Sequence, residues 1–128
     1  MAGLAPRNAM VSAGHPHSFL GIDSEGRSAI VSTTGNPDRH VVLRGGGGRP
    51  NHGREGVAAA LELVGDLGIA RPVMVDCSHD NSAKDHTRQA GVWRDVLAQL
   101  RDGETRLLGL LLESNLEAGR QSWQPGAA

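Results

Sequence analysis

Three short, almost continuously apolar runs punctuate the chain between its middle and its end. They comprise residues 41–43, 73–76 and 107–112. Apolar runs without alternation are typical of parallel strands that are covered on both faces. Their spacing of about 35 residues matches one strand plus one crossover helix. The pattern therefore predicts three parallel strands joined through helices.

The two segments between these runs repeat apolar residues at helical spacing. The first repeat comprises Val57, Leu61 and Val64, and the second comprises Trp93, Leu97 and Leu100 beside Val92 and Val96. Gly68 predicts the end of the first helix, and residues 82–85 have the spacing of a capping box before the second. This order of elements predicts an α/β fold with right-handed crossovers, in strand–helix units at about 40–68 and 73–101 and a last strand at about 106–113.

The first third of the chain follows a different pattern. Two apolar segments, 19–22 and 28–31, flank a polar turn, which predicts a β-hairpin at about 18–31. Residues 7–11 indicate the end of a helix before the hairpin. The terminal residues 121–128 show no periodicity and are expected to form a loose tail.

Composition excludes several classes of protein. The 128 residues include 13 basic and 14 acidic side chains and only three aromatic ones, so we expect no nucleic acid partner. No apolar run approaches the roughly 20 residues that cross a bilayer, and the N-terminus lacks the pattern of a secretory signal. A single cysteine suits a reducing compartment. We therefore expect a cytoplasmic protein without a membrane partner.

A residue suited to anion or metal chemistry follows each predicted parallel strand. Arg44 follows the first strand, His79 follows the second, and Glu113 follows the third. The C-terminal ends of parallel strands meet at one edge, which is where βα barrels place their active sites. A loop of four glycines, 45–48, follows Arg44. The backbone amides of this loop and the guanidinium of Arg44 could together bind a phosphate. The alternative is a flexible loop with a surface arginine.

His79 and Glu113 are candidate metal ligands. Asp76, Ser78 and Asn81 surround His79 in the sequence and could fix its ring tautomer; the alternative is a structural histidine that opens a helix. A nitrogen and an oxygen ligand suit manganese, iron, cobalt or zinc, although two ligands are too few for a complete site. Cys77 is expected to be a buried thiol rather than a ligand. The other histidines follow no ligand spacing and are expected at the surface or in the hairpin: His15, His17, His40, His52 and His86.

Four segments resemble the class I (microbial) 3-deoxy-D-arabino-heptulosonate 7-phosphate (DAHP) synthases. They are residues 16–21, 35–46, 76–86 and 113–121, and they match in order over nearly the whole chain. The resemblance implies the C-terminal portion of a (β/α)8 TIM barrel with an added N-terminal β-hairpin. It implies the condensation of phosphoenolpyruvate with erythrose 4-phosphate and water, which yields DAHP and phosphate as the first step of the shikimate pathway to aromatic amino acids.

The resemblance also implies roles for individual residues. Arg44 and His79 correspond to substrate-binding residues, and His79 and Glu113 correspond to ligands of a divalent metal (Mn, Fe, Co or Zn). The hairpin corresponds to a β-ribbon that helps to bind an aromatic amino acid inhibitor, and full-length members are expected to be homo-oligomers. No catalytic residue is assigned.

The chain departs from the family pattern at several points. The family's metal-binding cysteine and aspartate have no match in this chain, Gly47 replaces a usual lysine, and His52 replaces a usual tyrosine. We therefore expect the 128-residue chain to have little or no activity alone. One alternative is a non-catalytic remnant or regulatory fragment that associates with a full-length synthase. Another is a related barrel lyase or synthase that uses a different phosphosugar.

Overall fold

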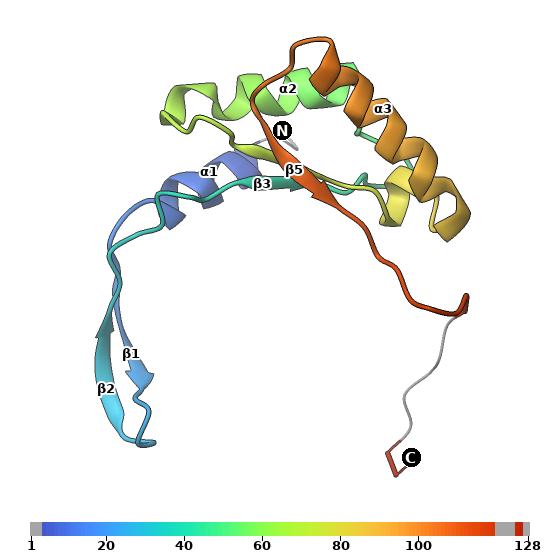
Figure 1. The fold of residues 1–128 in the computed structure, drawn as a ribbon. Helices are drawn as coiled ribbons and strands as arrows, with labels where there is room; N and C mark the ends of the chain where they lie inside the picture. Colours follow the sequence, from blue (N-terminus) through green and yellow to red (C-terminus); the bar gives the residue numbers. More distant parts are fainter. Residues whose placement is uncertain (1–3, 120–124, 127–128) are drawn as a thin grey trace.

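A three-stranded parallel sheet lies at the centre of the computed structural model, which describes residues 4–119 and 125–126. Its strands are β3 (Val41–Leu43), β4 (Val73–Asp76) and β5 (Leu107–Leu111), in the order β3-β4-β5. The connecting helices α2 (Arg54–Val64) and α3 (Gln89–Arg101) cover one face of this sheet (Figure 1). The predicted order of parallel strands and helices is confirmed, and the fold is mixed α/β.

The hydrophobic core lies between this helical layer and the sheet. The predicted stripe of α2 is confirmed, since Val57, Leu61 and Val64 are all buried against the strands. A short 3-10 helix, η1 (Gly65–Leu67), prolongs α2, and Gly68 ends it in the left-handed conformation with a φ of 67°. The core is completed by one face of the strands and of α3: Val73, Val75, Cys77, Val92, Val96 and Leu107.

Strand β5 contains one extra residue relative to β4. Val73 pairs with Leu107, whereas the next residue of β4, Met74, pairs with Gly109. Leu108 is therefore unpaired, as in a β-bulge. Because of this shift, Leu107 and Leu110 both pack toward the core, and Leu108 is 40% exposed.

The start of the second helix differs from the prediction. Ser82 does not cap α3 but ends a 3-10 helix, η2 (His79–Ser82), and the next two residues, Ala83 and Lys84, have left-handed backbones. A third 3-10 helix, η3 (His86–Arg88), precedes α3, and its N-cap is Asp85, whose side chain accepts a hydrogen bond from the Thr87 amide. The left-handed residues interrupt any helix there, so the predicted capping box is wrong.

The buried face of α3 is also rotated from the predicted stripe. Leu97 is 42% exposed, Trp93 and Leu100 are half-buried, and two glutamines, Gln89 and Gln99, are buried instead. Both buried glutamines hydrogen-bond to backbone groups of distant loops. These tertiary bonds allow polar side chains to occupy the core-facing positions.

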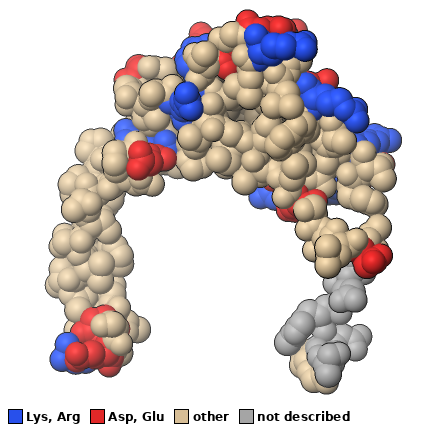
Figure 2. All heavy atoms as spheres, viewed as in Figure 1, with Lys and Arg blue, Asp and Glu red and all other residues tan. Residues whose placement is uncertain are grey.

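Helix α1 (Leu4–Ala13) leads into an antiparallel hairpin of β1 (Ser18–Ile22) and β2 (Ser28–Ser32), in which Ser18 pairs with Ser32. The hairpin, expected at about 18–31, projects away from the body of the molecule (Figure 1). Charged side chains gather at its tip, where Arg27 pairs with Asp23 and Glu25, whereas its stem is uncharged in this view (Figure 2). Four large apolar side chains of the hairpin are exposed: Phe19, Leu20, Ile22 and Ile30.

Among the described helices, none has the length and apolar character that crossing a membrane requires. The expected loose tail at 121–128 falls on a segment of which only residues 125 and 126 are described.

Candidate functional site

The structure brings the side chains of Arg44, His79 and Glu113 together at the C-terminal edge of the sheet. The guanidinium of Arg44, which follows β3, contacts Nε2 of His79. The same nitrogen lies 3.7 Å from Oε1 of Glu113, which follows β5. Three segments that are distant in the sequence thus contribute a cation, an imidazole and a carboxylate to one location.

Asp76 and Ser78 fix the imidazole of His79 from its other side. Nδ1 of His79 lies 2.9 Å from Oδ2 of Asp76 and 2.6 Å from the hydroxyl oxygen of Ser78. The Ser78 hydroxyl and amide both donate to Oδ1 of Asp76, at 2.6 Å and 2.8 Å. A carboxylate beside Nδ1 favours the tautomer with a proton on that nitrogen and a lone pair on Nε2. The lone pair of the His79 ring therefore lies on Nε2, the nitrogen that Arg44 contacts and that lies 3.7 Å from Glu113.

The electrostatics of Asp76 support this arrangement. Burial by itself raises the pKa of the Asp76 carboxyl, but hydrogen bonds from the Ser78 hydroxyl and amide and the nearby His79 outweigh it. The net effect is a pKa below the ordinary value, so Asp76 is ionised at neutral pH. One ligand atom from each of Asp76, His79 and Glu113 lies within 4.8 Å of the others.

The backbone of His79 is strained, since its φ of 55° lies in the left-handed region. A non-glycine residue in this region costs of the order of 1 kcal/mol or more, and such residues cluster at functional sites. The strain is opposed by the hydrogen bond of 2.7 Å that the Lys84 amide donates to the His79 carbonyl. Lys84 also lines a cavity of about 180 Å³ beside His79.

Among the described residues, Asn81 forms no hydrogen bond with the His79 ring, contrary to one part of the prediction. Its amide nitrogen instead donates to the carbonyls of Leu43 and Asp76, at 2.9 Å and 2.8 Å, and its oxygen accepts from the Asn51 amide at 2.8 Å. Asn81 therefore ties the end of β3 to the end of β4. The ring of His52 lies against the same oxygen and is only 15% exposed, so the prediction of a surface residue is wrong for His52.

The glycine loop does not present free amides to a phosphate in the way the sequence suggested. The Gly45 amide donates to the Asn51 side chain, the Gly46 amide to the Arg49 carbonyl, and the Gly48 amide to the Asp80 carboxylate. Gly45 itself is required, because it has a φ of 76° and a Cβ there would lie 2.6 Å from Cβ of Asp80. Three of the four glycine amides are thus engaged within the chain, whereas the Arg44 side chain is exposed.

Cys77 is fully buried and lies in the core. Burial raises the pKa of its thiol, and the adjacent Asp76 raises it further. A protonated, enclosed thiol is a poor metal ligand. The structure agrees with the interpretation of Cys77 as a core residue.

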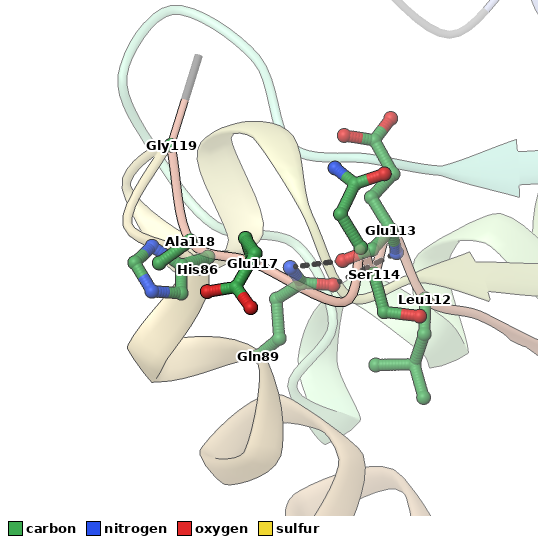
Figure 3. Close-up of a pocket in the computed structure, with 9 residues that line it drawn as sticks. His86, Gln89, Leu112, Glu113, Ser114, Glu117, Ala118 and Gly119 are labelled. Carbon is green, nitrogen blue, oxygen red and sulfur yellow. Dashed lines mark hydrogen bonds between the residues drawn. The ribbon is translucent and has the colours of Figure 1, made fainter.

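Sequence reasoning missed Gln89, whose amide bonds to the backbone of Glu113. Gln89 lines both the cavity beside His79 and an adjacent open cavity of about 380 Å³, which is also bordered by His86, Glu113 and Glu117 (Figure 3). The one available signal was a glutamine three residues before the buried Val92, on the core-facing side of a helix. That signal does not say which backbone group the amide meets.

Known proteins match this chain over almost its whole length. The model of the DAHP synthetase I family matches residues 3–128. The Tyr-sensitive phospho-2-dehydro-3-deoxyheptonate aldolase of Enterobacter agglomerans is 46% identical over 115 residues, which cover 90% of this chain and 54% of that protein. The Phe-sensitive enzyme of Escherichia coli strain K12 is 42% identical over 119 residues, which cover 93% of this chain and 34% of that protein.

A solved structure shows the same arrangement of elements. The phospho-2-dehydro-3-deoxyheptonate aldolase of Francisella tularensis SCHU S4 superposes with a TM-score of 0.84 at 38% identity, over 95% of this chain and 36% of that one. The chain spans about a third to a half of the length of the curated relatives cited above. Because the family match extends from residue 3 to residue 128, the chain belongs to the DAHP synthetase I family.

Proposed function

We propose that this chain forms part of the active site of a 3-deoxy-7-phosphoheptulonate synthase. The observation that supports the proposal is the meeting of Arg44, His79 and Glu113 at the C-terminal ends of three adjacent parallel strands. In a (β/α)8 barrel this edge is where active sites form. The proposed architecture is accordingly the C-terminal portion of such a barrel, with β3, β4 and β5 as three neighbouring strands.

His79 and Glu113 are the proposed ligands of a divalent metal. The donor set fits, because Nδ1 of His79 is engaged by Asp76, which leaves Nε2 available 3.7 Å from a Glu113 oxygen. Imidazole plus carboxylate suits manganese, iron, cobalt or zinc. The guanidinium of Arg44 contacts the same nitrogen, so coordination there requires that this contact open.

The proposed reaction joins C3 of phosphoenolpyruvate to the aldehyde carbon of erythrose 4-phosphate. Water adds at C2, and the bond between C2 and the phosphate oxygen breaks, which releases inorganic phosphate. When bound, the metal supplies a Lewis acid for the aldehyde or for the attacking water. Arg44 binds the phosphate or carboxylate of phosphoenolpyruvate through paired N–H donors. His79, held by Asp76 and Ser78, lies beside this position and also contacts substrate.

The test is calorimetric titration of the 128-residue chain with Mn²⁺, with and without phosphoenolpyruvate. We expect His79→Ala and Glu113→Gln each to weaken Mn²⁺ binding by about tenfold or more. Glu117→Gln is the matched control, since this exposed carboxylate lies four residues from Glu113 and should leave the affinity unchanged. Equal Mn²⁺ affinity of the wild type and Glu113→Gln would refute the proposed metal site.

Phosphoenolpyruvate provides a second readout in the same titration. We expect it to bind the wild-type chain and to bind Arg44→Ala at least about tenfold more weakly, because a charged, bidentate contact is lost. The isolated chain should not catalyse the condensation, since the family's metal-binding cysteine and aspartate have no match among its residues. Synthase activity of the purified chain with Mn²⁺ alone would contradict that expectation.

We further propose that the β1–β2 hairpin helps to bind an aromatic amino acid. The support is the name of the relatives, which are Tyr-sensitive and Phe-sensitive enzymes, together with the exposed apolar side chains of the hairpin. An alternative function is a regulatory chain that associates with a full-length synthase. The exposure of Val42, Leu108 and Leu111 on the strands supports it, because these side chains could pack against another polypeptide.

A further inference from the structure

We infer that Gln89 is a positioning residue that holds Glu113 in place to act as a metal ligand. The inference rests on the proposed metal role of Glu113 and extends the site to a residue on helix α3. Gln89 does not contact Arg44 or His79 through a hydrogen bond in the described structure. It acts through the backbone of Glu113.

Two hydrogen bonds join the Gln89 side chain to the Glu113 backbone. Nε2 of Gln89 donates to the Glu113 carbonyl at 2.9 Å, and the Glu113 amide donates to Oε1 of Gln89 at 3.0 Å. Both atoms of one side-chain amide are thus used on a single residue, as the dashed lines in Figure 3 show. Gln89 is only 7% exposed, so water competes weakly for these bonds.

Glu113 depends on these bonds because it lies beyond the sheet. Strand β5 ends at Leu111, whose carbonyl accepts the amide of Cys77 at 2.9 Å. Leu112 and Glu113 are both exposed. Within residues 4–119, the Glu113 backbone forms hydrogen bonds with Gln89 alone, and its side chain contacts His79 at 3.7 Å. Without Gln89, the backbone of Glu113 would lose the described contacts that orient its carboxylate.

The chemistry of the side chain explains why a glutamine is needed. A primary amide offers a donor and an acceptor at fixed spacing, which matches the C=O and N–H of one residue. A glutamate could accept from the Glu113 amide but could not donate to its carbonyl. Leucine or methionine could do neither. The start of α3 is itself fixed by Asp85 through η3, so Gln89 is presented from a defined position.

Gln99 provides a matched control for a merely structural role. It is the second buried glutamine of α3, it is 4% exposed, and its Nε2 donates to the His52 carbonyl at 2.9 Å. Gln89→Leu and Gln99→Leu both remove a buried amide from the same helix. A general loss of stability should affect the two variants alike. Only the first should disturb Glu113.

The experiment compares the wild type, Gln89→Leu, Gln99→Leu and Glu113→Gln as 128-residue chains. Mn²⁺ affinity is measured by calorimetry, and exchange of the Glu113 amide hydrogen is measured by NMR without metal. We expect Gln89→Leu to weaken Mn²⁺ binding by about tenfold and to speed exchange of the Glu113 amide by about tenfold. Gln99→Leu should change neither. Gln89→Met, which keeps the length of the side chain, repeats the test if the leucine variant does not fold.

The possible results separate this inference from the proposed function. If Glu113→Gln weakens Mn²⁺ binding but Gln89→Leu and Gln89→Met bind as the wild type does, the positioning role is wrong and the metal site stands. If Gln99→Leu weakens binding as much as Gln89→Leu, the effect is one of general stability and the inference is overturned. If Glu113→Gln binds Mn²⁺ like the wild type, the proposed metal site fails, and the inference fails with it.

Discussion

Replacement of Asn81 by alanine should destabilise the chain more than replacement of a nearby polar residue whose side chain makes only one hydrogen bond. Asn81 is 6% exposed and makes three hydrogen bonds of 2.8–2.9 Å, to the carbonyls of Leu43 and Asp76 and from the amide of Asn51. A typical buried hydrogen bond contributes about 1 kcal/mol net. Asn81→Ala should therefore lower the free energy of unfolding by about 3 kcal/mol, a large part of the total for a small domain.

Asn51→Ala is the control for this magnitude. The Asn51 side chain accepts one hydrogen bond, from the Gly45 amide at 2.7 Å, so its removal should lower the free energy of unfolding by about 1 kcal/mol. Asn81→Asp should be at least as harmful as Asn81→Ala. It keeps the acceptor for Asn51 but places a carboxylate against two carbonyl oxygens.

The assay is urea denaturation at pH 7 and fixed chain concentration, followed by the fluorescence of the half-buried Trp93. The midpoints and slopes give the free energies of unfolding of the wild type and the three variants. If Asn81→Ala costs no more than Asn51→Ala, then Asn81 does not join the ends of β3 and β4 in the way described, and the reasoning is refuted.

Two further predictions concern acid and thiol reagents. The hydrogen bonds from the Thr87 hydroxyl and amide hold the pKa of the Asp85 carboxyl below its ordinary value. The ionised carboxylate therefore stabilises the folded chain above about pH 4, and this stabilisation is lost as the pH falls through the pKa of Asp85 in the folded state. Thermal melts of the wild type and Asp85→Asn should differ at pH 6, and the difference should shrink as the pH falls below about 4; a constant difference would argue against this role of the Asp85 carboxylate. Cys77, fully buried and with its pKa raised by burial, should not react with a disulfide reagent at pH 8 until the chain is unfolded in guanidinium. Rapid labelling of the native chain would contradict the burial of Cys77.

The sequence was informative where a structure depends on local periodicity. The spacing of Val57, Leu61 and Val64 predicted the buried face of α2 correctly, because helical geometry alone sets which side chains share a face. Likewise, the ends of the parallel strands predicted that Arg44, His79 and Glu113 would meet. The parallel topology of the sheet alone places the carboxyl ends of its strands at one edge.

The sequence failed where a structure depends on contacts between distant segments. Residues 82–85 have the pattern of a capping box, but the bond from Lys84 to His79 and the left-handed backbone there belong to the site and not to α3. Gln89 was missed for the same reason, because its partner Glu113 lies 24 residues away. Periodicity cannot identify such a partner. The hydrogen bonds that the Gly45 and Gly48 amides donate to Asn51 and Asp80 could not be predicted from the sequence for the same reason.

The extra residue in β5 has a consequence for how insertions and deletions would act in this chain. Side chains of a strand alternate between two faces, and the unpaired Leu108 is skipped in this alternation, so Leu107 and Leu110 both face the core although they lie three residues apart. Continued past the strand, this parity directs Glu113 away from the helical layer and toward the imidazole. Deletion of Leu108 would leave Gly109, Leu110 and Leu111 paired with Met74, Val75 and Asp76, so it should keep Glu113 on its present side. Deletion of a paired residue such as Leu110 would instead shift the register by one residue and turn Glu113 to the opposite face, whereas substitution of Leu108 by another apolar residue should be tolerated.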